Sequence, residues 1–345
     1  MKIAQVAPLY ESVPPPAYGG TERVVSYLTE ALVQMGHDVT LFASGDSVTS
    51  ARLVAVVPRG LRLDPAGRDP LVWHTIMLDM VLEQAGSFDV IHFHTDVLHL
   101  PLVGRCPTPC LSTAHGRLDL PDLEPLFRRF PEQPMVSISD SQRAPLPWLN
   151  WRRTVHHGLP PGLYSFHPRP RDYFAFVGRI SPEKRVDRAI EIARACHTPL
   201  RIAAKVDPAD RQYFESAIEP LLDDPLVTFL GEIGDAGKDD LIGHARALLM
   251  PIDWPEPFGL VMVEALACGT PVIAWRHGAV PEILEAGATG FVVEGMRQAI
   301  EAAENIGTIS RQRCRETFEQ RFSARVMARA YLDVYRELIG AEMAA

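Results

Sequence analysis

The chain has 345 residues, a length that suits two domains of ordinary size better than a single core. Hydrophobic residues make up 47% and charged residues 22%, which is the balance of a folded protein and excludes a disordered one. The formal net charge is −9 and no long basic run is present, so a nucleic-acid partner is not expected.

The location of the protein is inferred from its first residues and its apolar stretches. No stretch approaches the roughly 20 apolar residues that a membrane span needs. Residues 1–7 run into a strand-like pattern without the apolar region and cleavage site of a signal peptide, so we expect a cytoplasmic protein. The pairs Arg128–Arg129 and Arg152–Arg153 leave room for peripheral contact with the inner face of the membrane, although solvated surface charge is the simpler explanation.

The five cysteines are scattered and odd in number, which argues against a disulfide scaffold. Cys106 and Cys110 are close in sequence, but no neighbouring Cys or His completes a set of four metal ligands. We therefore expect inert thiols, no metal site and no bound cofactor.

The first half of the chain alternates short β-branched runs with longer helical patterns. A strand is predicted over residues 2–8, followed by an amphipathic helix over 21–35 with Thr21 as N-cap and Gly36 as C-cap. Further strands are predicted over 38–43, 54–57, 90–94, 110–114 and 135–139.

A second series of the same kind starts near Tyr173. Strands are predicted over 174–177, 200–204, 227–230, 247–251, 271–274 and 290–293, with helices over 188–196 and 324–339. Alternating strands and helices predict an α/β fold with two parallel, Rossmann-like sheets. The stretch 158–171 is rich in Pro and Gly, so we place the domain boundary there.

The loop after the first strand carries Gly19 and Gly20 directly before a helix. Backbone N–H groups at a helix start favour an anion, and glycine lets a phosphate come close. The loop does not read GxGxxG, so the dinucleotide fingerprint of a nicotinamide-dependent dehydrogenase is missing. An ordinary capped loop is the alternative explanation.

A basic pair follows the first strand of the second series. Arg179 and Lys184 lie five residues apart across a turn that contains Pro182, so both side chains could converge on one diphosphate. Solvated surface cations are the alternative.

The segment 253–274 carries two glutamates eight residues apart. Pro257 suits the start of a helix, which would put Glu256 at the helix mouth and Glu264 about two turns inside, about 12 Å further on. Glu264 stands among apolar residues and needs a partner there, either ribose hydroxyls or a buried salt bridge. Glu256 would address a ligand or merely complement the helix dipole. The backbone N–H groups at the helix start could also bind sugar or phosphate oxygens of a ligand. These groups belong to Phe258, Gly259 and Leu260.

Three segments together resemble the group 1, or family 4, retaining glycosyltransferases. They read YGGTE at 18–22, FVGRISPEKR at 176–185 and EPFGLVMVEALACGTPVIA at 256–274. They occur in that order, the resemblance spans nearly the whole chain, and the E-x7-E spacing within the third is its most specific part. The resemblance implies a GT-B fold, with two Rossmann-like domains facing across a cleft, and transfer of a hexosyl group from a nucleoside-diphosphate sugar to a hydroxyl acceptor.

The resemblance also implies the domain roles. Residues 1–160 would form the acceptor-side domain with the glycine loop, and residues 161–323 the nucleotide-sugar domain. Residues 324–345 would form a helix that packs back on the first domain.

Donor contacts follow from the matched positions. Gly19 and Gly20 would cover the donor diphosphate, while Arg179 and Lys184 would stabilise the departing nucleoside diphosphate. Glu256 would address the donor sugar and Glu264 would bind ribose. Backbone near Ile233, after a strand of the second series, would contact the base, and UDP is preferred over GDP or ADP on family frequency alone.

On the acceptor side, His115 matches the histidine that faces donor sugar and acceptor, with a structural hydrogen-bonded histidine as its alternative. His94, Asp96 and Asp119 are further candidates for contacts with acceptor hydroxyls. Family members often carry a glycine-rich turn where this chain has Lys205, whose role stays open.

The implied reaction needs no metal, because the cations stabilise the leaving diphosphate, and no Asp-x-Asp cluster is evident. Two alternatives remain besides the dehydrogenase. A sugar-nucleotide 2-epimerase shares the architecture but not this combination of motifs. A non-catalytic nucleotide-sugar-binding protein would not need the charged set.

Overall fold

The structure is a computed structural model that describes residues 1–16 and 19–343. Tyr18 of the YGGTE segment and the last two residues of the predicted final domain lie outside the described residues. The chain forms two compact units. The first contains Met1–Pro160 together with the chain from Ala324 onward, and the second contains Pro161–Ser323.

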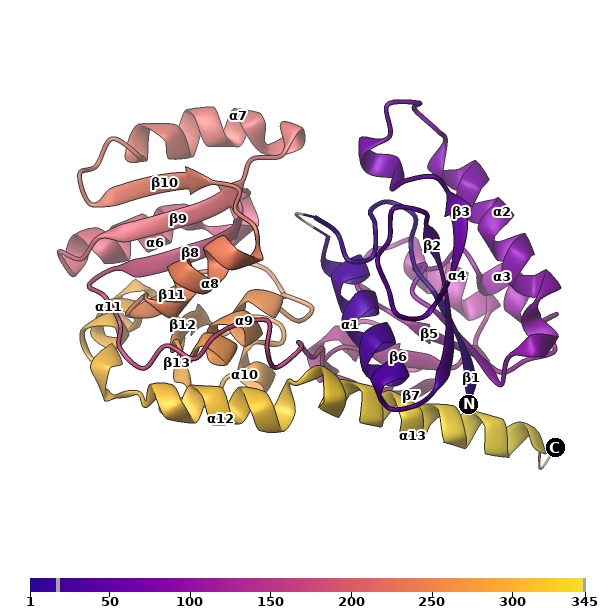
Figure 1. Cartoon of the computed structure of the whole chain (residues 1–345). Coiled ribbons are helices and arrows are strands. Elements are labelled where there is room, and N and C mark those ends of the chain that lie inside the picture. The colour runs from indigo at the N-terminus through magenta and orange to yellow at the C-terminus, as the bar shows by residue number, and fades with distance from the viewer. Residues whose placement is uncertain (17–18, 344–345) are drawn as a thin grey trace. The chain divides into compact units, whose positions relative to one another are not determined.

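The first unit is built on a sheet of seven parallel strands in the order β3-β2-β1-β4-β5-β6-β7 (Figure 1). The strands are β1 (Lys2–Val6), β2 (Asp38–Ser44), β3 (Arg52–Val57), β4 (Val90–Phe93), β5 (Cys110–Thr113), β6 (Met135–Ser137) and β7 (Trp151–Thr154). Its helices are α1 (Gly20–Gln34), α2 (Pro70–Glu83), α3 (Leu100–Val103), α4 (Leu123–Arg129), α5 (Asp140–Arg143) and α13 (Ala324–Met343).

The second unit is built on six parallel strands in the order β10-β9-β8-β11-β12-β13. These are β8 (Phe174–Arg179), β9 (Leu200–Lys205), β10 (Val227–Gly231), β11 (Ala247–Met250), β12 (Val272–Trp275) and β13 (Gly290–Val293). Its helices are α6 (Val186–Ala195), α7 (Arg211–Tyr213), α8 (Asp235–Gly243), α9 (Leu260–Cys268), α10 (Val280–Ile283), α11 (Met296–Glu304) and α12 (Arg311–Arg321).

The predicted fold class of two parallel, Rossmann-like sheets is confirmed. The central strands are apolar on both sides because helices cover both faces of such a sheet. In β1, for example, Ile3, Ala4 and Val6 are fully buried, and so are Leu248 and Ile273 in the second sheet, or nearly so.

Among the elements that the sequence analysis did not predict are α2 and β7, and in both cases the reason can be identified. The helix α2 has apolar residues on its exposed side as well, including Leu71 and Val72, so it lacks the amphipathic pattern that marks a surface helix. The edge strand β7 reads WRRT, and its two arginines hide it among polar residues. The predicted N-cap of the first helix was wrong, because Gly19 takes that position and Thr21 lies inside the helix.

The last helix, α13, belongs to the first unit, where it packs against α1 (Figure 1, yellow). Its Tyr331 and Tyr335 are fully buried and reach side chains of the sheet. Within the described residues, no helix combines the length and apolarity needed to cross a membrane.

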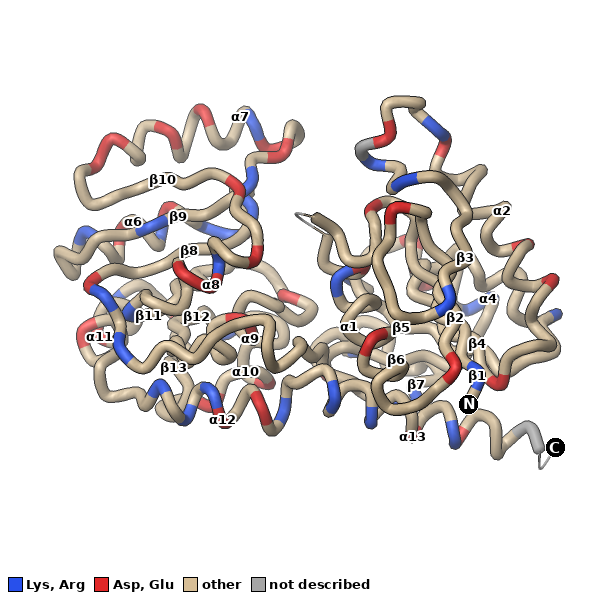
Figure 2. Tube along the Cα trace, viewed as in Figure 1, with Lys and Arg blue, Asp and Glu red and all other residues tan. Residues whose placement is uncertain are grey.

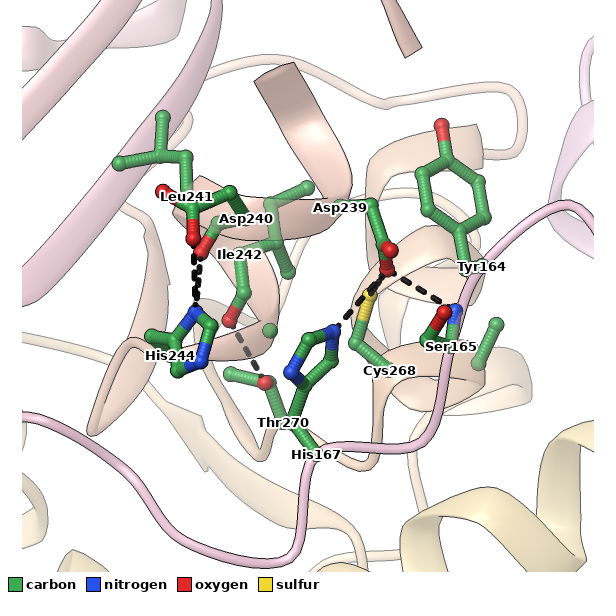
Figure 3. A network of polar contacts seen from close by, with 12 residues as sticks. Tyr164, Ser165, His167, Asp239, Asp240, Leu241, Ile242, His244, Cys268 and Thr270 are labelled. Carbon is green, nitrogen blue, oxygen red and sulfur yellow. Dashed lines mark hydrogen bonds and ion pairs between the residues drawn. The ribbon is translucent and has the colours of Figure 1, made fainter. Parts of the chain in front are cut away.

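The segment at the start of the second unit, which includes Ser165 and His167, is held by contacts with α8 and α9 (Figure 3). The carboxylate of Asp239 on α8 accepts a hydrogen bond from the backbone N–H of Ser165 at 2.9 Å, and its Oδ1 lies 3.2 Å from His167 Nε2. The thiol of Cys268, at the end of α9, lies 3.7 Å from the same oxygen. One carboxylate thus joins the entering segment to two helices.

A partly buried arginine on α12 completes this junction. The guanidinium of Arg311 donates to the carbonyl oxygens of His167, Gly243 and Ala245 at 2.6 to 2.9 Å, and to Thr270 Oγ1 at 2.7 Å. Most of these acceptors have no access to water, so they depend on this one side chain.

Replacing Arg311 by Met should therefore lower the free energy of unfolding by about 3 kcal/mol or more, because several buried acceptors lose their donor at once. The control is Arg297→Met, since the Arg297 side chain is 88% exposed and faces Glu301 only at 3.9 Å. Chemical denaturation followed by circular dichroism measures both. Equal stability of the two variants would contradict this role for Arg311.

Candidate functional site

Charged side chains of the second unit gather where β8 and β11, neighbouring strands, end. Arg179 is the last residue of β8, and Lys184 closes a short 3-10 turn over Pro182–Lys184. Glu256 lies in the loop after β11. Because the carboxyl ends of parallel strands share one edge of a sheet, these loops lie together.

Lys184 and Glu256 form an ion pair. Lys184 Nζ lies 2.5 Å from Glu256 Oε2, and Trp254 Nε1 donates to the same oxygen at 3.2 Å. The ammonium of Lys184 also lies 4.9 Å from the centre of the Trp254 ring, in a cation–π contact. Within residues 1–16 and 19–343, no donor reaches the other carboxylate oxygen, Oε1, of Glu256. The nearly buried carboxylate, 8% exposed, therefore keeps one oxygen for a further partner.

The loop that carries Glu256 is held by a glycine that was not predicted. At Gly278 a Cβ atom would lie 2.2 Å from the carbonyl oxygen of Glu256 and 2.3 Å from its nitrogen. The next residue, Ala279, donates its N–H to the same carbonyl at 2.9 Å. With φ at +55°, Gly278 also has a backbone conformation that disfavours other residues. The loop can therefore take this position only beside glycine.

The predicted helix start at Pro257 was wrong. The helix α9 begins at Leu260, after Gly259 in the left-handed conformation with φ at +84°. A side chain at 259 would also press against Met262 and Met250, at 2.8 and 3.0 Å. Glu256 thus lies in a loop and not at the helix mouth, and the seven residues between the two glutamates are not one run of helix. The physical reason is the left-handed turn, which a sequence pattern does not reveal.

Of the three predicted backbone donors, Phe258 has its side chain in the core, 2% exposed and edge-on to Phe322. Gly259 and Leu260 are partly exposed at the start of α9. Ile233 lies in the loop between β10 and α8. A Cβ atom added at Gly237 would lie 3.2 Å from the Cβ atom of Ile233. The helix α9 offers its first N–H groups from Leu260 on, one turn later than expected.

Glu264 is buried, 3% exposed, in the middle of α9. Its Oε1 accepts a hydrogen bond from Lys238 Nζ on α8 at 3.1 Å, and Lys238 lies 3.8 Å from Asp235. The structure thus supplies the salt bridge that was the alternative to ribose hydroxyls. Lys238 was missed because α8 has no clear apolar period, although a lysine early in a helix after a strand is a signal that could have found it.

Arg179 has several acidic neighbours. Its Nη2 donates to Glu183 at 2.7 Å, and its other nitrogens lie 3.7 Å from Asp207 and 3.5 Å from Asp210. Lys205 shares one of them, with Nζ 2.8 Å from Asp207. Figure 2 shows this alternation of basic and acidic residues where the chain leaves β9 and enters α7. Arg179 and Lys184 therefore have separate carboxylate partners, and an incoming anion must compete with Glu183 for Arg179.

In the first unit, the glycine loop is anchored by its neighbours. Val13 donates its N–H to Ser47 Oγ at 2.9 Å, and Leu61 donates to the carbonyl of Leu9 at 2.8 Å. At Gly19 a Cβ would lie 2.8 Å from the Pro15 side chain, so close packing requires glycine there. At Gly20, which is exposed, a Cβ would meet nothing within 4 Å. Packing therefore explains the first glycine but not the second.

His115 lies in the loop after β5. Its Nε2 lies 2.8 Å from His94 Nδ1, and its ring stacks on His157 with centroids 5.3 Å apart. Burial lowers the pKa of His115 to about 3, so the ring is neutral near pH 7. Gln142, which was not predicted, holds the loop from both sides by donating to the carbonyls of Ala114 and Gly116 at 3.0 and 2.7 Å.

The structure gives the three predicted acceptor contacts different surroundings. His94 is fully buried with both ring nitrogens bonded, to His115 and to Gln5, so it has no polar atom left for a ligand and stands behind His115. Asp119 is held by Arg117 through two hydrogen bonds of 2.8 Å, which lower its pKa. Asp96 is exposed after β4, with a left-handed φ of +49°.

Across the described residues, no three His, Cys, Asp or Glu side chains lie close enough together to hold a metal ion.

Two family models match the chain. The one described as Glycosyltransferase Family 4 matches residues 18–190, and the one described as Glycosyl transferases group 1 matches residues 165–325. A glycogen synthase of Mycobacterium tuberculosis is 26% identical, over 97% of this chain and 95% of its own length. A D-inositol 3-phosphate glycosyltransferase of Rhodococcus opacus is 27% identical, over 82% of this chain and 76% of its own.

Solved structures agree with this. A glycosyltransferase involved in avilamycin A biosynthesis superposes with a TM-score of 0.77 at 27% identity, covering 99% of this chain and 98% of its own. A sucrose-phosphate synthase from Thermosynechococcus elongatus reaches 0.78 at 19% identity, over 99% and 100% of the two chains, and shares the fold.

The Gly278 contact makes a prediction about the Glu256 loop. Gly278→Ala should lower the free energy of unfolding by about 2 kcal/mol or more, because the new methyl group forces the loop away and the positive φ is strained. Hydrogen exchange of the amides in residues 254–259 should speed up. Gly307→Ala is the matched control, since a Cβ at Gly307 meets nothing within 4 Å. Unchanged exchange in the Gly278 variant would contradict the proposed support.

Proposed function

The chain belongs to the group 1, family 4 glycosyltransferases, and from this we propose that it moves a hexosyl group from a nucleoside-diphosphate sugar to a hydroxyl acceptor. The observation that carries the proposal is the pair of Lys184 and Glu256 at the end of β8 and β11, with Nζ and Oε2 2.5 Å apart. A cation suits the leaving phosphate, and a carboxylate with one unused oxygen suits a sugar hydroxyl.

Donor binding rests on the second unit. Arg179 and Lys184 bind the diphosphate, and the diphosphate displaces Glu183 from Arg179. Glu264 turns to the ribose hydroxyls while Lys238 keeps its charge compensated. The N–H groups of Gly259 and Leu260 meet donor oxygens, as does the exposed Gly20 of the first unit. UDP is our preferred nucleotide, and this preference rests on family frequency.

The reaction proceeds with retention and without a metal ion. The bond from the anomeric carbon to the diphosphate oxygen breaks, and the acceptor oxygen attacks from the same face. Its proton passes to the leaving phosphate. Negative charge builds on the leaving oxygen, where Arg179 and Lys184 stabilise it. No side chain serves as covalent nucleophile.

The acceptor side involves residues after β4 and β5 of the first unit. His115 faces the sugar and the acceptor hydroxyl, and the exposed Asp96 is a better candidate than Asp119 for a second acceptor contact. The acceptor is a saccharide, a lipid or a small molecule. A cytoplasmic location with contact to the inner membrane face stays a prediction.

Nucleoside diphosphates should stabilise the protein. UDP at a concentration 100 times its dissociation constant would add about 2.7 kcal/mol of stability, which a thermal-shift panel of UDP, GDP and ADP detects. Arg179→Met should abolish the shift, whereas Glu183→Gln should preserve or enlarge it because Arg179 loses its competing partner. If none of the three nucleotides shifts the melting temperature, the donor class is wrong.

Transfer should depend on the ion pair. Lys184→Ala and Glu256→Ala should each fold, as judged by circular dichroism, and lower the turnover number by about 100-fold or more. Release of UDP from UDP-sugars in the presence of an acceptor panel measures this. Glu294→Gln is the control, because Glu294 lies in an exposed surface pair with Arg276. Full activity of both alanine variants would refute the site, and conversion of the donor sugar without any acceptor would indicate the epimerase instead.

A further inference from the structure

A chain of buried hydrogen bonds connects the last helix to His115. Tyr335 on α13 accepts a hydrogen bond from Gln5 Nε2 on β1 at 3.0 Å. Gln5 Oε1 lies 2.8 Å from His94 Nε2, and His94 Nδ1 lies 2.8 Å from His115 Nε2. Gln5, His94 and Tyr335 are fully buried. This series of hydrogen bonds therefore runs from α13, past the side chain of Gln5 on β1, to the loop after β5.

Each imidazole in this series of hydrogen bonds carries a single proton. Burial lowers the pKa of His94 well below its ordinary value and that of His115 to about 3. A neutral imidazole has one N–H donor and one nitrogen acceptor, so a bond at one nitrogen fixes the role of the other. The direction of every link then follows from the direction of the first.

The Gln5 amide sets that direction. Its NH2 group faces Tyr335, so its carbonyl oxygen accepts from His94 Nε2–H. His94 Nδ1 is then an acceptor and takes the proton of His115 Nε2–H. What remains on His115 is Nδ1 without a proton. This atom is buried and has no hydrogen-bond partner among the described residues.

The opposite direction would require the amide to turn by 180°. Tyr335 would then donate to Gln5, and His115 would present Nδ1–H instead of a bare nitrogen. The structure has the first direction, because Gln5 Nε2 donates to the Tyr335 hydroxyl, which also lies 2.8 Å from His92 Nδ1. With Gln5 donating to it, the hydroxyl is free to donate to His92, whose Nε2 then donates to Thr113 Oγ1 at 2.7 Å.

We propose that Gln5 and Tyr335 are positioning residues that hold His115 as its Nε2–H tautomer, so that Nδ1 accepts a hydrogen bond from a hydroxyl of the donor sugar or the acceptor. The identity of that hydroxyl rests on the proposed glycosyltransferase function, whereas the tautomer does not. The stacking of His115 on His157, with 20° between the rings, further limits rotation of the imidazole.

The tautomer is measured directly in the ligand-free, full-length protein. Long-range 1H–15N correlation spectra of a 15N-histidine-labelled sample distinguish protonated from bare ring nitrogens, and His115→Gln assigns the signals. We expect His115 to appear with a proton on Nε2 and a bare Nδ1. A proton on Nδ1 would overturn the proposal, whatever the protein's activity.

Two tyrosines on the same helix give a matched pair of variants. Tyr335→Phe removes the hydroxyl that orients Gln5, so the His115 signals should shift toward the other tautomer or a mixture. Tyr331→Phe removes an equally buried hydroxyl whose hydrogen-bond partner in the described part of the chain is Thr113, at 2.9 Å, and should leave the His115 signals unchanged. Gln5→Leu should reproduce the effect of Tyr335→Phe. Equal spectral effects of the two tyrosine variants would overturn the positioning role.

Activity supplies an independent measure. Tyr335→Phe and Gln5→Leu should each lower kcat about tenfold, the scale of one hydrogen bond, with little change in UDP binding. Tyr331→Phe should retain the wild-type kcat. A loss of kcat that is the same in both tyrosine variants would indicate a merely structural role. If no transfer is detected in the wild type, the proposed function fails. The tautomer measurement still tests whether Gln5 and Tyr335 position His115.

Discussion

The contact between Lys184 and Glu256 is the interaction on which the second unit's strand ends depend. Both groups lie in loops after adjacent strands, and each would be unfavourable there alone because a charge out of water needs a partner. Their attraction joins the β8 loop to the β11 loop, and the tight turn at Gly278 and Ala279 holds the second loop from behind. The order of the strands, the conformation of the β11 loop and the ion pair therefore all favour the same placement of Lys184 beside Glu256.

The two units handle buried polar groups in different ways. The second unit uses ion pairs, with Lys184 on Glu256 and Lys238 on Glu264. In the first unit, the network that reaches His115 consists of hydrogen-bonded histidines, tyrosines and amides, and Glu11, Glu22 and Arg23 are also buried in this unit. A paired charge can be exchanged for a charged ligand, whereas a neutral chain of hydrogen bonds transmits orientation and little charge. This difference matches the proposed division, in which one unit binds a diphosphate and the other presents hydrogen-bonding groups to a sugar.

The sequence was sufficient to predict the alternation of strands and helices, both sheets and the family, because buried parallel strands read as apolar runs and the E-x7-E segment is specific. It was not sufficient for features that depend on conformation or distant partners. Because of the left-handed turn at Gly259, α9 begins later than predicted, and α2 lacks a clear amphipathic period because apolar residues also lie on its exposed side. Lys238 and Gln142 gain meaning only from contacts across the fold. Gln5 and Tyr335 are 330 residues apart, beyond any local pattern. The roles of the site residues stay predictions.

The return of α13 to the first unit makes the second unit, topologically, an insertion between Pro160 and Ala324. A hybrid enzyme that took everything after residue 160 from a relative would therefore place a foreign helix against the sheet of the first unit. Its tyrosines would have to match Gln5, His92 and Thr113. Recombination that respects the fold needs two junctions, with the tail and the first 160 residues taken from the same parent.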